Sequence, residues 1–590
     1  MLKLINLILK SIMEIVFKEK SGIMRFKNFV KKNALIIATV LFSIVYGLFW
    51  YLLLPPISIH SFWFVFYLGL FIAYILFLVL FLCKDKIISK TKNKEVKALT
   101  YRYGQFKCVK TTLDKKVSFW NIFGFSFISV LGVICITALI LLISGTKLFR
   151  ANEYYSQLSI EEDTIENFEE IYSYGEGDVM LPLIDKDLAF KLAEAKLADY
   201  GAQFEIDYNN FTLMSVTRDG KHELVRVSPL EYSSFFVSLS KINEGSVGYI
   251  EVNVITKEAR LVKFDEGLKY MPSAMFNYDL KRHIYSKYPN ALFDETNFEI
   301  DDEGTPYWVI PSYKPEIGLY GGKKNDAVIV CNAITGDLNK YKIGEEPHWL
   351  DRAFDEEILA FQATNALRYK HGFMNVHFGA KDEVLQVSDG YNYFVKDGHT
   401  YYVSCITSPS ESDQTSVGFL TIDIKTGEAK KYLIPGITEM RAMEIAKQDE
   451  RVKAQQLEAT WPILINYKGV PTYFLVLKND VQAQKIVFIN VYDGALVAMG
   501  DSIDGAKEEY NRLLASNGDV SVIEFEFSGE VIRTRDLGET IEFTLSGVEG
   551  YFVVDVNLSL DARFLQVGDE VNLEVKQYDG YYFVTSIERK

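Results

Sequence analysis

Three long stretches near the N-terminus contain only apolar and uncharged polar residues. They span residues 34–54, 61–83 and 120–144, and none contains Lys, Arg, Asp or Glu. Each is at least as long as the roughly 20 residues that a helix needs to cross a bilayer. A helix of this length without a charged face is rare in a soluble protein. The pattern therefore predicts three transmembrane helices that form a membrane anchor over residues 34–146.

Beyond residue 180 the pattern changes to short apolar segments separated by turn residues. A strand–turn–strand pattern recurs four times, and the first polar residues of the four copies are Asn253, Asn332, Asp423 and Asn490. A run with helical spacing precedes each copy, at 184–199, 275–288, 353–371 and 439–458. The order predicts an α+β fold of four tandem units, each with one helix on an antiparallel sheet. The expected boundaries are 181–270, 271–347, 348–436 and 437–502.

The repeated polar residues have a structural explanation within these hairpins. Asp423 and Thr426 can hydrogen-bond turn amides, and Gly427 can adopt the left-handed conformation that closes the turn. We favour this structural role over ligand binding for the whole set. Lys257 replaces the glycine in the first unit and predicts a strained or different turn. The equivalent residues of the other units are Asn253, Thr256, Asn332, Thr335, Gly336, Asn490, Asp493 and Gly494.

The helix, the G-x-x-Y-x-V strand and the closing hairpin together resemble PepSY modules. The closest matches are FLTIDIKTGEAKKY from Phe419 and VIVCNAITGDLNKY from Val328, whereas the fourth unit has Asp493-Gly494 in place of Thr-Gly. The resemblance covers residues 183–500. PepSY modules occur in peptidase propeptides and in membrane-anchored bacterial envelope proteins. The resemblance implies a non-catalytic inhibitory or sensing role outside a bacterial membrane.

The tail, residues 517–590, has five strand-like runs with a short helical piece between the third and the fourth. This order resembles a small OB-type β-barrel. The tail carries six Lys/Arg and fifteen Asp/Glu, so it would repel a phosphate backbone. We therefore expect a protein-interaction or capping module and no nucleic-acid partner.

Charge is distributed unevenly along the chain. Residues 1–33 carry eight Lys/Arg and two Glu, and residues 84–116 carry eleven Lys/Arg and three acidic residues, so the remainder must carry −29 to give the total of −15. Basic segments beside apolar spans favour the cytoplasmic side. We expect a basic amphipathic segment at 1–33, a basic cytoplasmic loop at 84–116, and an acidic stalk at 147–180. Everything after Gly145 is expected to be extracytoplasmic, and Met1 and Met24 remain alternative starts.

No catalytic, cofactor-binding or metal-binding motif is present in the sequence. It lacks a phosphate-binding loop, an H-E-x-x-H motif, paired C-x-x-C motifs and a G-x-S-x-G turn. His371 and His377 flank Gly372, which we expect to end a helix, and this spacing argues against a shared metal. Cys331 and Cys405 could be bridged, although buried free thiols are favoured. We predict no catalytic residues, no cofactor and no metal.

These observations favour a membrane-anchored scaffold or regulatory binding protein of a bacterial envelope that engages protein or peptide segments. An accessory subunit of a secretion, conjugation or cell-wall machine is the alternative. An enzyme with a site between modules is a second alternative. The expected partners are the membrane and an outer protein or peptide, while the organism and the oligomeric state stay open.

Overall fold

The computed structural model describes residues 34–82, 95–102, 105–112 and most of the chain from residue 143 onward. Isolated residues between 131 and 140 are also described. Beyond residue 143 the stretches left out are 164–179, 379–382, 410–414, 480–481, 518–522 and 579–580, with a few single positions. The chain divides into two compact units, residues 1–57 and residues 58–590.

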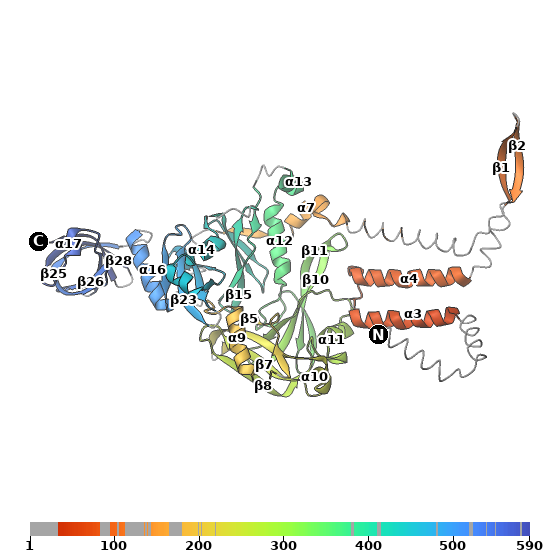
Figure 1. The fold of residues 1–590 in the computed structure, drawn as a ribbon, viewed down its shortest axis with the longest axis horizontal. Coiled ribbons are helices and arrows are strands. Elements are labelled where there is room, and N and C mark those ends of the chain that lie inside the picture. The colour runs from red at the N-terminus through yellow and green to blue at the C-terminus, as the bar shows by residue number, and fades with distance from the viewer. Residues whose placement is uncertain are drawn as a thin grey trace. The chain divides into compact units, whose positions relative to one another are not determined.

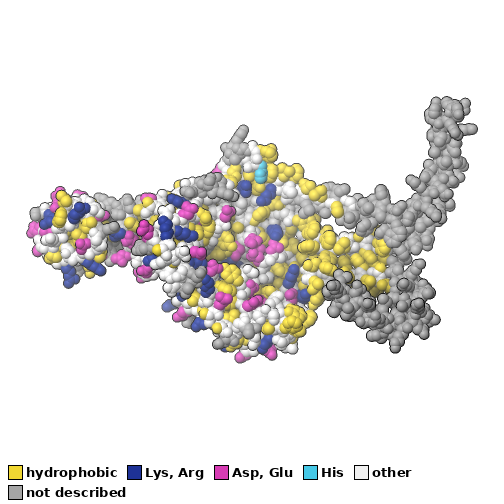
Figure 2. All heavy atoms as spheres, in the orientation of Figure 1, with side chains coloured by type: hydrophobic (Ala, Val, Ile, Leu, Met, Phe, Trp, Pro, Cys, Tyr) yellow, Lys and Arg dark blue, Asp and Glu magenta, His cyan; other side chains and the backbone are white. Residues whose placement is uncertain are grey.

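Two helices in the described residues are long and apolar enough to cross a membrane. Helix α3 (Ala34–Leu53) belongs to the first unit, and helix α4 (Phe62–Leu82) belongs to the second. Their spanning windows have mean hydropathies of 2.2 and 2.5. Figure 2 shows their side chains as an apolar surface, in contrast to the mixed charges elsewhere. The prediction of three spans is wrong in number, and residues 120–142 of the third stretch lie almost wholly outside the described residues.

The segment predicted to be a basic loop contains a β-hairpin. Strands β1 (Glu95–Arg102) and β2 (Gln105–Thr112) pair antiparallel, with Arg102 opposite Gln105. The basic segment predicted at 1–33 lies outside the described residues.

Four sheets of four to six strands each, all antiparallel except for one parallel edge, occupy residues 160–500 (Figure 1). The first contains β4 (Phe204–Ile206), β5 (Thr212–Arg218), β6 (Lys221–Tyr232), β7 (Ser246–Asn253) and β8 (Ala259–Leu268). The second contains β9 (Asn297–Ile300), β10 (Pro306–Ile317), β11 (Gly321–Asn332) and β12 (Leu338–Lys342). The third contains β3 (Ile160–Asp163), β13 (Gln386–Val387), β14 (Asn392–Lys396), β15 (His399–Thr407), β17 (Gly418–Asp423) and β18 (Ala429–Tyr432). The fourth contains β20 (Glu458–Ala459), β21 (Ile463–Tyr467), β22 (Val470–Lys478), β23 (Ala483–Asn490) and β24 (Val497–Gly500).

Short helices lie between and beside these sheets, and β16 (Thr415–Ser416) pairs with β19 (Gly436–Ile437). Several helices begin with a side-chain cap, such as Asp185 on Leu188 N and Asp355 on Ile358 N, each at 3.0 Å. The helices are α7 (Lys147–Tyr155), α9 (Lys186–Leu197), α10 (Phe235–Ser240), η1 (Phe276–Tyr278), α11 (Leu280–Lys287), α12 (Glu356–Arg368), α13 (Gly372–His377), α14 (Glu439–Ala446), α15 (Glu450–Gln455) and α16 (Ile503–Asn517).

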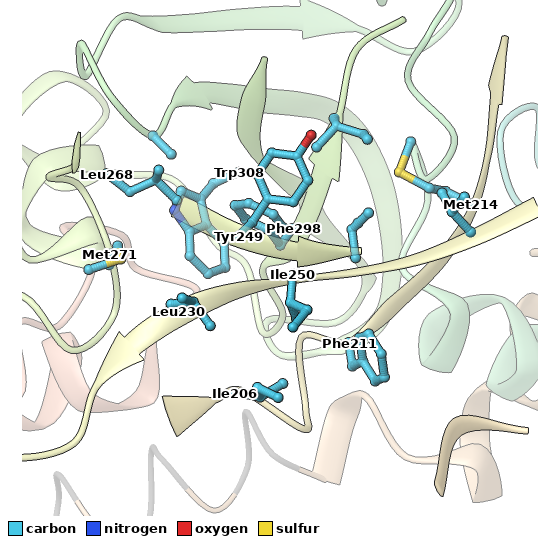
Figure 3. Close-up of a cluster of buried hydrophobic side chains, with 14 of the residues drawn as sticks. Ile206, Phe211, Met214, Leu230, Tyr249, Ile250, Leu268, Met271, Phe298 and Trp308 are labelled. Carbon is cyan, nitrogen blue, oxygen red and sulfur yellow. The ribbon is translucent and has the colours of Figure 1, made fainter. Parts of the chain in front are cut away.

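The first two sheets share one hydrophobic core (Figure 3). The ring of Phe298 on β9 lies 5.8 Å from Tyr249 on β7 and 5.4 Å from Trp308 on β10, measured between ring centroids. All three side chains are at most 1% exposed. The Tyr249 hydroxyl also donates to the carbonyl of Gly304, at 3.1 Å. Neither sheet therefore has a closed core of its own.

The third and fourth sheets share a second core. Phe419 on β17 contacts Tyr473 on β22, with ring centroids 5.8 Å apart, and both are buried. Helix α16, which follows the predicted boundary at residue 502, packs Tyr510 and Leu514 into this core. The predicted fold class, with three membrane helices and four tandem helix-plus-sheet modules, is therefore wrong. The sheets are fused through shared cores and are not separate repeats.

Part of the predicted stalk belongs to the folded region. Helix α7 buries Ala151 and Tyr154, and the Tyr154 ring lies 6.3 Å from Phe361 on α12. Strand β3 pairs in parallel with β18 and places Ile160 opposite Ala429. Residues 147–163 therefore belong to the folded region instead of forming a stalk, with β3 as an edge of the third sheet, while 164–179 lie outside the described residues.

The C-terminal region is a closed five-stranded barrel with its own core. Its strand order is β25-β26-β27-β29-β28, and β28 returns to pair with β25. The short helix α17 lies between the third and fourth strands, where the sequence places a helical piece. The elements are β25 (Ile523–Asp536), β26 (Thr540–Leu545), β27 (Tyr551–Asp555), α17 (Leu560–Arg563), β28 (Glu570–Tyr578) and β29 (Tyr581–Arg589).

Candidate functional site

A pocket of about 340 Å³ lies where the four sheets meet, and every sheet contributes to its wall. Arg226 comes from β6 of the first sheet and Asn297 from β9 of the second. Tyr393 lies on β14 of the third sheet, and Trp461 lies between β20 and β21 of the fourth. The volume is within the range of small-molecule sites.

Arg352, just before α12, is the most buried cation of the pocket, with 4% exposure. Its guanidinium donates to Glu356 Oε1 at 2.7 Å and to the carbonyl of Leu213 at 3.3 Å. It also lies 5.1 Å from the centre of the Tyr393 ring, at cation–π distance. Tyr393 donates its hydroxyl hydrogen to the other oxygen of Glu356. Arg352 and Glu356 therefore neutralise each other.

The position of Arg352 is set by buried carboxyl groups behind the pocket. Glu299, on β9, accepts hydrogen bonds from the backbone N–H groups of Asp351 and Arg352, at 2.9 and 3.1 Å. Asp351 accepts from Ser215 N and from the Thr400 hydroxyl, at 3.2 and 2.7 Å. Burial, and then the charge of Asp351, raise the pKa of Glu299 to about 7. These bonds join strands of three sheets to the start of α12.

Two further cations of the pocket have no carboxylate partner within ion-pair distance in the described chain. Arg226 donates only to the Phe211 carbonyl, at 3.2 Å, and its Nε is buried without a partner. Lys186 lies 4.5 Å above the Tyr208 ring and 3.4 Å from the Asn209 carbonyl. Burial, and then the charges of Arg226 and Arg352, lower the pKa of Lys186 to about 8. Burial also lowers the pKa of Arg226, to about 10.

The acidic residues at the rim are already paired. Asp185 and Asp187 both bind the ammonium of Lys478, Asp187 at 3.2 Å. Asp187 also accepts the Tyr208 hydroxyl hydrogen at 2.5 Å. The rim carboxylates thus hold α9 against β22, and neither Lys186 nor Arg226 has a carboxylate of the described chain within ion-pair distance.

Aromatic and amide side chains form the rest of the wall. The ring of Trp461 packs against Gly390, where a Cβ would come within 2.2 Å of it, and the indole N–H is buried without a partner. Asn392 donates to the carbonyl of Trp461 at 2.7 Å and fixes this loop. Tyr391 is 47% exposed and lines the pocket where it opens to solvent. The pocket combines N–H donors with flat apolar surfaces, a composition suited to an anion that carries an apolar body.

The predicted turn residues lie away from this pocket and bind their own backbones. Each first polar residue accepts two turn amides through one oxygen, at distances from 2.8 to 3.3 Å. The four acceptor residues are Asn253, Asn332, Asp423 and Asn490. In each turn one of the two donating amides belongs to the residue three positions later, namely Thr256, Thr335, Thr426 and Asp493.

The closing glycines of the second and third hairpins have φ values of +79° for Gly336 and +76° for Gly427, as the turn pattern predicts. Lys257 adopts the same left-handed conformation with φ of +65°, which is strained for a residue with a side chain. Gly494 does not have a left-handed φ. It gives space to Ile445, whose Cδ1 would lie 2.8 Å from an added Cβ.

The remaining candidate residues form no reactive group among the described residues. Cys331 and Cys405 are buried free thiols, so the alternative of a disulfide between them is wrong. The Cys405 Sγ lies 3.0 Å from the Tyr473 hydroxyl. His371 immediately precedes α13 and His377 is its last residue. Across the described part of the chain, no group of three or more His, Cys, Asp or Glu could hold a metal ion.

Sequence reasoning missed the pocket because its residues are widely separated. Lys186 and Trp461 lie 275 positions apart in the sequence and have no shared motif. The only local signal is an arginine within the apolar strand β6, where Arg226 interrupts buried neighbours. A cation in such a strand needs a partner or a ligand.

No protein-family model and no curated protein matches the chain. A structure described as structural mimicry for functional antagonism has a TM-score of 0.10 and 12% identity, over 23% of this chain and 88% of that chain. A tryptophan-to-alanine mutant of the Synechocystis apocarotenoid oxygenase has a TM-score of 0.13 and 10% identity, over 66% of this chain and 64% of that chain. Likeness at these scores carries no argument about fold or function, and the PepSY resemblance stays a prediction from short motifs.

Proposed function

We propose that this chain is a membrane-anchored binding protein that engages protein or peptide segments and catalyses no reaction itself. The observation that carries the proposal is the pocket between the sheets, whose Lys186 and Arg226 have no carboxylate partner. The nearby carboxylate of Glu356 is engaged by Arg352 and Tyr393, so it is not free to act as a general base. Helices α3 and α4 would supply the membrane attachment.

We also propose that the large acidic region acts on the outer side of a bacterial envelope. The support is the charge pattern, since the basic segments 1–33 and 84–116 favour the cytoplasmic side. Because α3 and α4 together return the chain to the side on which it starts, this proposal requires one more crossing between residues 116 and 147. Cysteines placed at Lys94 and Ser516, in a background without the five native cysteines, test this with an impermeant reagent in intact cells. Labelling at position 516 alone is expected. Labelling at position 94 alone would show that the chain has the opposite orientation in the membrane.

Sheet edges offer a second means of contact for an extended segment. Strands β8 and β12 each end their sheet in the described part of the chain. A bound strand would gain main-chain hydrogen bonds there, while the acidic surface favours basic segments at low salt.

The full-length chain in mild detergent, screened against peptide arrays and hydrolase substrates, tests the proposal directly. Binding of peptides without turnover is the expected result. Turnover that one point substitution abolishes, without any bound peptide, would refute the binding function and favour an enzyme.

A further inference from the structure

Three residues that line the pocket have nitrogen donors that no acceptor of the described chain satisfies. The Nε atoms of Arg226 and Arg352 and the indole nitrogen of Trp461 are all buried without a hydrogen-bond partner. A buried donor left without a partner costs about 1–3 kcal/mol. Three such donors around one pocket indicate a missing acceptor.

The charges of the pocket point to an acceptor that is negative. The pocket cations Lys186 and Arg226 lack a carboxylate within 4 Å, whereas Arg352 has Glu356 and the rim acids have Lys478. An anion placed between Lys186 and Arg226 would offset the hydration that each cation loses on burial. The oxygens of Glu356 do not fill this role, because they accept hydrogen bonds from Arg352 and Tyr393 and none from Lys186 or Arg226.

The geometry of the Arg226 guanidinium favours a planar anion as the ligand. The Nη1 of Arg226 is held by the Phe211 carbonyl, so the free donor is on the Nε edge. Arginine presents such an edge to the two oxygens of a carboxylate more effectively than a point charge does. The rings of Tyr208, Tyr391 and Trp461 offer flat apolar walls for the body of the ligand.

From these contacts we propose that the pocket binds the carboxylate of an aromatic residue with a free C-terminus, either as an N-acylated amino acid or at the end of a peptide. The carboxylate lies against Arg226, Lys186 and the Trp461 N–H. The ring stacks on the aromatic wall, and the volume of about 340 Å³ holds one residue of this size. This inference rests on the proposed binding function and names its ligand class.

Titration calorimetry on the full-length chain in detergent tests this site. The probes are N-acetylphenylalanine, its C-terminal amide, a heptapeptide ending in phenylalanine as free acid and as amide, and inorganic phosphate. Both free acids should bind, and each amide should bind about tenfold or more weakly, as expected for a lost charged hydrogen bond. Binding of N-acetylphenylalanine alone would identify a free small acid as the ligand, and binding of the heptapeptide acid would identify a peptide terminus.

Variants separate the site from the fold. Arg226→Gln and Lys186→Gln should each weaken binding of the acid about tenfold or more. Trp461→Phe keeps an aromatic ring but removes the N–H donor, and it should also weaken binding. Lys221→Gln, an exposed position on the same strand, is the matched control and should have no effect.

Equal binding of acid and amide, binding of phosphate but not of the acids, no binding of any probe, or unchanged acid binding in both Arg226→Gln and Lys186→Gln would overturn the inference. Array binding that persists in Arg226→Gln would leave the proposed function standing while this site fails.

Discussion

Tyr393 on β14 donates its hydroxyl hydrogen to Glu356, the first residue of α12, and so joins a strand to a helix across the pocket. The same carboxylate binds Arg352 at 2.7 Å through its other oxygen. One glutamate thus neutralises the buried arginine and anchors the phenol. Because Glu356 is bound by Arg352 and Tyr393, the pocket cations that remain available to a ligand are Lys186 and Arg226.

Removal of this hydroxyl should destabilise the fold. Tyr393→Phe keeps the ring beneath Arg352 but leaves an oxygen of Glu356 without its donor. We expect a loss of about 1–2 kcal/mol in the free energy of unfolding. Urea denaturation measures it, with Tyr551→Phe on the exposed barrel surface as the control. Equal midpoints for Tyr393→Phe and the native chain would contradict the bond.

Alanine substitutions at two hairpin glycines distinguish the cost of backbone strain from the cost of a steric clash. Gly427 and Gly220 both have positive φ, but an added Cβ at Gly427 would lie 2.7 Å from the Phe354 ring, whereas at Gly220 it meets nothing within 4 Å. Gly220→Ala should lower stability by about 1 kcal/mol, and Gly427→Ala should lower it further. Thermal unfolding compares them, and equal losses would argue against the contact with Phe354.

The shared core predicts that the first two sheets unfold together. Phe298→Ala removes a ring that contacts Tyr249 and Trp308, and it should lower stability by about 3–5 kcal/mol. Hydrogen exchange followed by mass spectrometry should show lost protection in both 204–268 and 297–342. Exchange that rises in the second sheet alone would restore the idea of separate modules.

A buried carboxyl group gives stability a defined dependence on pH. Burial raises the pKa of Glu231 to about 7, so the folded chain keeps a proton that the unfolded chain has lost. The contribution of Glu231 to stability is therefore greatest below pH 4.5 and declines as pH rises from about 4.5 to about 7. Glu231→Gln should remove this decline and raise stability at pH 8 by about 1–3 kcal/mol. If the free energy of unfolding varies with pH in the same way for the variant and the native chain, Glu231 is not the group responsible for the decline.

The local elements were accessible from the sequence, because they depend on neighbouring residues. Helical spacing located α9 and α12, and the Asx residues with their glycines located hairpins such as the one closed by Gly427. The way in which the four sheets pack against one another could not be predicted from the sequence. Strand β22 is buried at every position except its last, so both of its faces need a partner. Such continuous apolar runs contradict independent modules that expose one sheet face, but they do not say which sheet covers which.

The pocket was even less accessible, since its residues become neighbours only through the fusion of the sheets. The lysine–aspartate bonds from Lys478 to Asp185 and Asp187 connect positions almost 300 residues apart. Nothing in the sequence near Arg226 identifies Trp461 as its neighbour. The search for motifs within short windows therefore found only the turn residues.

The most direct test of the account is photo-crosslinking at the mouth of the pocket. A benzoylphenylalanine is placed at Tyr391, which is 47% exposed there, and at Tyr551 on the barrel as the control. On irradiation of intact cells, the account predicts a defined protein or peptide adduct at position 391 that is absent at position 551 and lost when Arg226→Gln is added. No adduct at position 391, or an adduct that Arg226→Gln leaves unchanged, would contradict a binding function based on this pocket.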